Sequence, residues 1–154
     1  MADTRNLTGF KELAENLKKL GPKLAKNGLR SATSAGAAII RNDARARAPV
    51  DTGELKKDIQ IKRERDTQGG ELFRALYSVY TRSGKRSRLS GKARNVDKDS
   101  FYWKFQEFGT AKQAAQPYMR PAFEANKDAA IDRIGEKLDE HIQKHARELA
   151  GGGS

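Results

Sequence analysis

Two histidines near the C-terminal end of the chain are the first candidates for chemistry. His141 and His145 are four residues apart, a spacing that lets two imidazoles on one helix share a metal ion. The stretch reads His-Ile-Gln-Lys-His and lacks the glutamate that a zinc-peptidase motif places beside its first histidine. No third ligand is indicated, and the chain has no cysteine. We therefore expect no metal site and interpret the pair as surface histidines near a helix end, where positive charge is mildly favourable.

Other catalytic patterns are equally incomplete. Nucleophilic catalysis requires a nucleophile, a base and an orienting group, and no serine of the chain lies in a strand–turn–helix elbow. Gly84-Lys85 and Gly91-Lys92 are only fragments of a phosphate-binding loop. Asp139 and its neighbour Glu140 fit an ordinary helix surface. The sequence therefore predicts no enzyme, with no catalytic, cofactor-binding or metal-binding residue and no cofactor.

Residues 82–98 form the most basic segment of the sequence. Seven basic residues against one acid, Asp97, give this segment a local charge of +6 in a chain of net charge +11. We expect a long loop that contacts DNA phosphates or an acidic protein surface, without base recognition because it lacks aromatic residues. The candidate contact residues are Arg82, Lys85, Arg86, Arg88, Lys92, Arg94 and Lys98.

Length and composition limit the architecture. The chain has 154 residues, of which 36% are hydrophobic and 33% are charged, and we expect one domain over residues 1–150. The last four residues, 151–154, read as a flexible tail or linker. The N-terminus lacks the pattern of a signal peptide, and no apolar run approaches the length of a membrane span. We therefore expect no contact with a membrane.

Apolar periodicity predicts three main helices, at about 7–20, 22–48 and 121–149. Gly21-Pro22 should separate the first two helices, and Pro121 should occupy the first position of the last one. Small residues dominate 31–38 in the second helix, where they would let another backbone approach closely. We interpret this stretch mainly as a buried helix contact, with contact between subunits as the alternative.

A corner and a hairpin should follow the second helix. Pro49 ends the helix, Asp51 is the expected N-cap of a short helical turn, and Glu54 is its capping-box partner. Val50 and Leu55 occupy the positions of a hydrophobic staple. Alternating residues then predict a β-hairpin with strands at about 58–65 and 71–80. The predicted fold class is α+β, three main helices packed with a hairpin and the long basic loop.

Two stretches resemble the tail-completion or neck proteins of long-tailed phages, the head–tail joining family that includes relatives of the lambda minor tail protein Z. The first stretch is Ala46 to Leu55, and the second combines Phe105 to Thr110 with Gln116 to Ala122. Their order, the hairpin between them and the closing amphipathic helix match that family over roughly residues 5–150. The residues taken as family motif are Pro49, Asp51, Thr52, Gly53, Glu54, Leu55, Glu107, Phe108, Gly109, Thr110, Pro117, Arg120 and Pro121.

The resemblance implies a non-enzymatic virion protein, assembled in the bacterial host cytoplasm into a homo-oligomeric ring, a hexamer, at the neck or tail. Neighbouring neck and tail proteins would be its partners, and DNA would pass through its channel. We further hypothesise that Glu107 and Arg120 pair across the link that joins the two parts of the second motif. The alternative function is a small basic nucleic-acid-binding protein that acts through residues 82–98. A toxin or modifying enzyme of prophage origin is a third possibility, and the missing catalytic residues oppose it.

Overall fold

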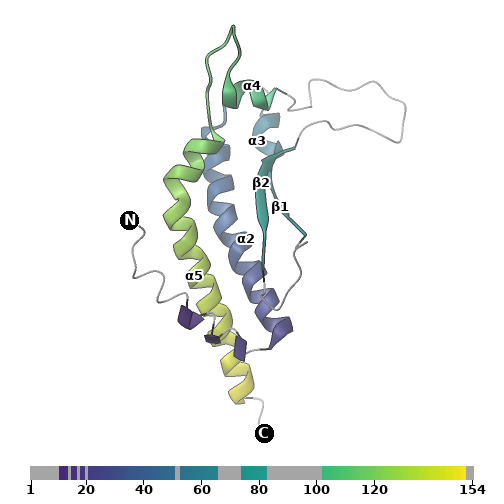
Figure 1. Cartoon of the computed structure of the whole chain (residues 1–154), viewed down its shortest axis with the longest axis vertical. Coiled ribbons are helices and arrows are strands. Elements are labelled where there is room, and N and C mark those ends of the chain that lie inside the picture. The colour runs from purple at the N-terminus through teal and green to yellow at the C-terminus, as the bar shows by residue number, and fades with distance from the viewer. Residues whose placement is uncertain are drawn as a thin grey trace, which may run out of the picture. The chain divides into compact units, whose positions relative to one another are not determined.

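The computed structural model describes residues 11–13, 15–16, 18–19, 21–50, 53–65, 74–82 and 102–151. Residues 11–13, 15–16 and 18–19 are helical, in agreement with the first predicted helix. The elements that follow are α2 (Pro22–Arg47), α3 (Glu54–Asp58), β1 (Ile59–Arg63), β2 (Tyr77–Thr81), α4 (Trp103–Phe108) and α5 (Met119–Gly151) (Figure 1). The α+β class predicted from the sequence is confirmed.

The chain divides into two compact units, which are described separately. The terminal unit comprises Met1–Gly36, Arg63–Tyr77 and Asp128–Ser154, and the motif unit comprises Ala37–Lys62 and Ser78–Lys127. Helices α2 and α5 each contribute one part to each unit. None of the helices in the described part of the chain is long and apolar enough to cross a membrane.

In the terminal unit, the start of α2 packs against the second part of α5 through small residues. Pro22 is the first residue of α2, as predicted, and it follows Gly21 with a φ of 85°. A Cβ on Gly36 would lie 2.8 Å from the carbonyl oxygen of Ala130, so the two backbones approach closely. The expected close approach at the small-residue stretch is therefore present within the chain. The core of the unit contains Ala25, Ala32 and Leu138, with Leu13, Leu29, Ile134 and Ile142 packed against it.

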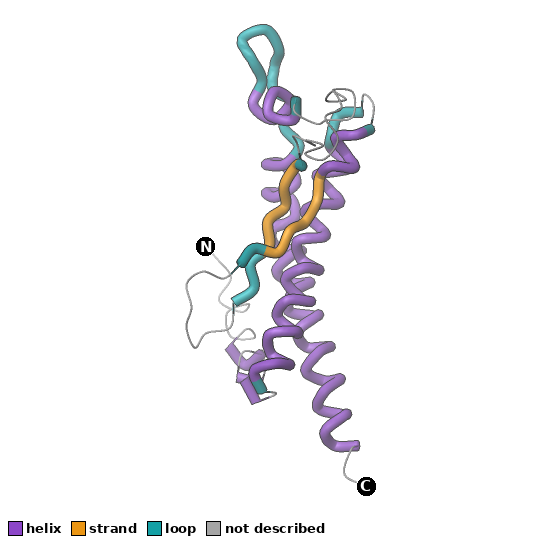
Figure 2. Tube along the Cα trace, turned by 90° about the vertical axis from the view of Figure 1, so that its right-hand side faces the viewer, coloured by secondary structure: helices purple, strands orange, loops and turns teal. Residues whose placement is uncertain are grey.

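The strands β1 and β2 form a two-stranded antiparallel sheet (Figure 2). The backbone N–H of Arg82 donates to the carbonyl of Asp58, and that of Glu64 donates to the carbonyl of Leu76. This register places alternate residues of β1 on the same face, and Ile59 on that face is fully buried. The predicted hairpin is confirmed, although β2 begins later than expected and residues 71–73 lie outside the described part.

Candidate functional site: a capped corner that joins the two motifs

The start of α5 is held by a carboxylate from another helix. Glu107 lies in α4 and is 7% exposed. Its Oε2 accepts the backbone N–H groups of Tyr118 at 2.9 Å and Met119 at 3.0 Å, and its Oε1 accepts that of Arg120 at 3.1 Å. A negative charge at this position is favourable, because the N-terminus of a helix carries unpaired N–H groups and a partial positive charge.

Every backbone N–H of this first turn is accounted for. Glu107 takes those of Tyr118, Met119 and Arg120, and the next residue, Pro121, has none to offer. Ala122 then makes the first bond of the helical series, from its N–H to the carbonyl of Tyr118 at 3.3 Å. Pro121 is the third residue of α5 and not the first, so the predicted start of this helix was wrong by two residues.

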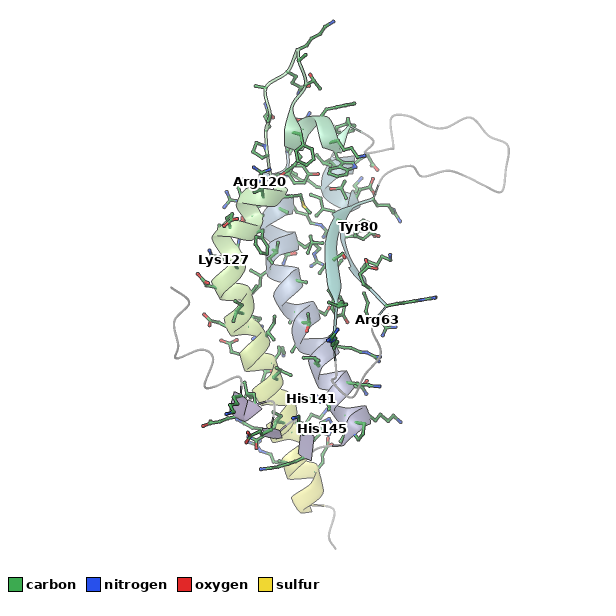
Figure 3. The ribbon with its side chains drawn as sticks, viewed as in Figure 1. Arg63, Tyr80, Arg120, Lys127, His141 and His145 are labelled. Atoms are coloured by element: carbon green, nitrogen blue, oxygen red, sulfur yellow. The ribbon has the colours of Figure 1, made fainter. Side chains whose placement is uncertain are left out.

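The hypothesised ion pair between Glu107 and Arg120 is also wrong. Glu107 does bind Arg120, but through the backbone N–H, and the side chain of Arg120 is exposed at the start of α5 (Figure 3). Three backbone donors converge on the carboxylate and hold it within the motif. Glu107 therefore fixes the path of the backbone between α4 and α5.

The first motif forms a corner that differs from the prediction. Helix α3 begins at Glu54 and its N-cap is Gly53, with a φ of 76° and no side-chain capping bond. Glu54 pairs with Lys57 at 2.9 Å, and Val50 is 68% exposed. The predicted N-cap at Asp51 is wrong, because a glycine in the left-handed conformation directly precedes α3, and the exposure of Val50 contradicts the predicted hydrophobic staple. The bond between Glu54 and Asp51 that would complete the capping box stays a prediction. Asp51 and Thr52 lie outside the described residues.

The two motifs meet in the core of the motif unit. Leu55 from the first motif and Tyr118 and Ala122 from the second are buried in one cluster. The other buried members of the cluster are Ala44, Ala48 and Ile59, and Val79, Tyr102, Trp103 and Met119 pack against it. Pro49, which follows α2, is partly buried. Residues far apart in the sequence thus share one packing site.

Tyr118 links this core to the hairpin. Its hydroxyl and that of Thr81, at the end of β2, share a buried hydrogen bond of 2.8 Å. Burial raises the pKa of the Tyr118 hydroxyl to about 12, the bond to Thr81 opposes the rise, and the charge of Glu107 adds to it. The phenol is neutral at physiological pH and acts as a structural hydrogen-bonding group.

Arg82, the first basic residue of the segment 82–98, forms an ion pair within the motif unit. Arg82 is half exposed, and its Nη2 lies 3.5 Å from Oδ1 of Asp58, a carboxylate that is almost fully buried. Arg45 of α2 donates from Nε to the carbonyl of Ile59 at 2.9 Å and so reinforces the neighbouring strand. The other candidate contact residues lie outside the described part of the chain, namely Lys85, Arg86, Arg88, Lys92, Arg94 and Lys98.

An exposed turn connects α4 to α5. Gly109 ends α4 with a φ of 73°, and Thr110 pairs with Gln113 in an isolated bridge. A Cβ at Gly109 would lie 2.8 Å from the backbone nitrogen of Ala115, so this position requires glycine. Residues 110–117, including the motif residue Pro117, are all exposed, and the turn projects from the helices (Figure 1).

The histidines have structural contacts. The Nε2 of His141 lies 2.9 Å from the carbonyl oxygen of Leu24, and Gly28 leaves the space that its ring occupies. The Nδ1 of His145 lies 2.6 Å from Glu148, and the two rings are edge to face at 4.5 Å (Figure 3). They are partly buried rather than on the surface as predicted. Within the described residues, no group of three or more metal-ligating side chains exists.

The motif residues in the described part of the chain cap a helix, turn the backbone and fill a core. Residues 11–109 match the family described as "Bacteriophage HK97-gp10, putative tail-component", and since this is more than half of the chain, the chain belongs to that family. No match was found among curated proteins or among solved structures.

The family match ends at Gly109, within the second motif. The backbone groups that Glu107 binds, at residues 118–120, therefore lie just beyond the matched region. Glu107 was predicted to pair with the side chain of Arg120, whereas it binds the backbone N–H of that residue. Pro121 is the signal that could have identified the cap. A proline favours the first turn of a helix, and the free N–H groups just before it need an acceptor such as the Glu107 carboxylate.

Proposed function

We propose that the chain is a non-enzymatic subunit that assembles into a ring, a hexamer, and joins the head to the tail or completes the tail of a long-tailed phage. Membership of a phage tail-component family supports a virion role. In this proposal the subunits close a scaffold between neck and tail proteins and leave a channel for DNA. The ring number rests on the resemblance of the two motifs.

The observation that carries the proposal is a contrast within the motif unit. Glu107 and the turn at Gly109 hold the backbone rigidly through hydrogen bonds, whereas Phe105, Phe108 and Phe123 are exposed. A protein that stays monomeric in solution seldom exposes several large aromatic side chains on one small unit, and such residues are enriched in protein interfaces. This arrangement is typical of a preorganised surface that binds neighbouring proteins.

Deletion of the gene from the phage or prophage that encodes it tests this function. Electron microscopy of the lysate should show filled heads and tails that are separate, or tails of aberrant length. Supplying the intact protein from a plasmid should restore joined particles. Normal infectious particles without the protein would overturn the proposal.

The basic segment supports a second, narrower proposal about DNA. Seven cations within 82–98 would neutralise backbone phosphates as DNA passes through the channel. The isolated protein is compared with a variant in which the six cations from Lys85 to Lys98 are glutamine. If the chain acts instead as a free nucleic-acid-binding protein, the unassembled intact protein should bind DNA with a steep salt dependence that the variant loses. If the ring is the functional form, DNA binding by the unassembled protein should be weak in both.

A further inference from the structure

One face of α4 presents two phenylalanine rings to solvent. Phe105 is 47% exposed and Phe108 is 64% exposed. They are three residues apart, so they lie on one side of the helix. Glu107 is buried on the other side, and Trp103 packs against the core of the motif unit.

This aromatic face of α4 is held in a fixed position. Three backbone groups bind Glu107, and the N–H of Gln116 donates to the carbonyl of Gln106 at 2.7 Å. The N–H of Gly109 donates to the carbonyl of Phe105 at 2.9 Å and closes the last turn. A rigid apolar face loses little conformational entropy when a partner covers it.

The charge around this face limits what can cover it. Lys104 is exposed and precedes Phe105, and Arg120 and Lys112 are exposed on the segment that follows α4. None of these three cations forms an ion pair with a described residue. The complementary partner is therefore an apolar surface bordered by carboxylates.

A surface of that kind exists on the chain itself. Residues 128–140 of α5 hold five acidic and two basic residues, a net charge of −3 in a chain of +11. Ile131 is 41% exposed there, and it is flanked by exposed Asp128 and Asp132. Neither aspartate is in an ion pair with any residue that the structure describes. Two copies of so basic a chain repel each other through their net charge, and a contact between a basic face and this acidic one offsets part of that repulsion.

We propose that the aromatic face of α4 in one copy packs on Ile131 of α5 in the next copy, with Lys104 facing Asp128 and Asp132. The inference rests on the proposed ring and names the contact that builds it. Because the two surfaces are different, the contact runs head to tail and repeats from copy to copy, as a closed ring requires.

Cysteine pairing tests the contact directly, because the natural chain has no cysteine. Phe108→Cys protein is mixed with isotope-labelled Ile131→Cys protein and oxidised, and the disulfides are identified by mass spectrometry. The proposal predicts that the mixed disulfide forms at least about tenfold faster than with Val50→Cys, whose side chain is 68% exposed but lies outside α4. Equal rates for the Phe108→Cys and Val50→Cys proteins would overturn it.

Sedimentation of surface variants separates this inference from the proposed function. Phe108→Ser should raise the Kd of self-association about 30-fold, and Lys104→Glu about tenfold. Lys104→Glu chains mixed with Asp128→Lys/Asp132→Lys chains should associate more tightly than either variant alone, since the natural faces are complementary and the charge-reversed faces are complementary as well. Val50→Ser is the control and should associate like the natural chain.

The outcomes point to different failures. If the natural chain associates and Phe108→Ser and Lys104→Glu associate equally well, the named contact is wrong and a ring must use another surface. If the natural chain stays monomeric at every concentration, the contact between copies is wrong, whereas the role in joining heads to tails is still judged by the particles that form without the protein.

Discussion

Removing the Glu107 carboxylate should destabilise the motif unit at the junction between α4 and α5. Glu107→Ala deletes the acceptor of three backbone hydrogen bonds at 2.9–3.1 Å. Glu107→Gln keeps the shape and one acceptor oxygen, so it loses the charge and the bonds to the other oxygen. The pair of variants therefore compares a partial with a complete loss of the cap.

The magnitude follows from the three contacts. A hydrogen bond to a charged group contributes about 1.5–3 kcal/mol, but the bonds to one carboxylate are not additive. The donor of Tyr118 is buried, whereas those of Met119 and Arg120 are partly accessible, so water replaces part of the loss. We expect Glu107→Ala to lower the free energy of unfolding by about 3–4 kcal/mol, and Glu107→Gln by about 1.5–2 kcal/mol. For a chain of this size, these losses correspond to roughly 10 °C and 5 °C in Tm.

Thermal and urea unfolding followed by circular dichroism would measure both changes. Glu136→Gln is the matched control, because Glu136 lies on α5, is exposed and pairs with Arg133 at 2.8 Å. An exposed pair of this kind contributes less than about 1 kcal/mol. Amide hydrogen exchange should in addition lose protection at Tyr118 and Met119 in the Glu107 variants alone. A Glu107→Gln protein as stable as Glu136→Gln would refute the assignment of the cap.

Three further changes test other parts of the structure. Gly36→Ala should destabilise the protein by about 1–3 kcal/mol in urea unfolding, since the added Cβ meets backbone at 2.8 Å, whereas Ser34→Ala on the same helix should be neutral or mildly stabilising. Gly109→Ala should cost about 2 kcal/mol, because it combines a φ of 73° with a 2.8 Å contact, and an unchanged Tm would contradict the strained turn. The pKa of Tyr118, raised from 10.0 to about 12, means that its neutral form stabilises the fold below pH 10, and that this contribution falls as the pH rises from 10 to 12. Tyr118→Phe should therefore lose less stability than the natural protein between pH 9 and pH 12, and parallel losses in the two proteins would refute a buried phenol.

The elements with strong local signals were predicted well. Helix α2 was expected at 22–48 and spans Pro22–Arg47, because Pro22 starts it and Pro49 prevents it from continuing. Apolar periodicity located most of α5, and alternation located the hairpin. These signals lie within one element, and packing against the rest of the chain reinforces them.

The predictions that failed concern which groups cap a helix or bind a side chain, since partners nearby in the sequence compete with partners far away in it. Asp51 has the spacing of an N-cap three residues before Glu54, yet the N-cap of α3 is Gly53. Spacing alone cannot decide this, because it ignores the left-handed conformation that glycine permits. Glu107 was selected as a charged member of a motif, but its partners are backbone groups 11 to 13 residues away, which carry no side-chain signature in the sequence. The exposure of Phe108 was also unpredictable, since an aromatic cluster gives no indication of which rings face the core.

The most direct test of the proposed role is a cryo-electron microscopy reconstruction of the particles that contain this protein. We expect a closed ring of copies of this chain at the head-proximal end of the tail, with the Phe108 face of each copy covered by α5 of the next. Absence of the chain from purified particles, or its location away from the junction between head and tail, would contradict the proposed role.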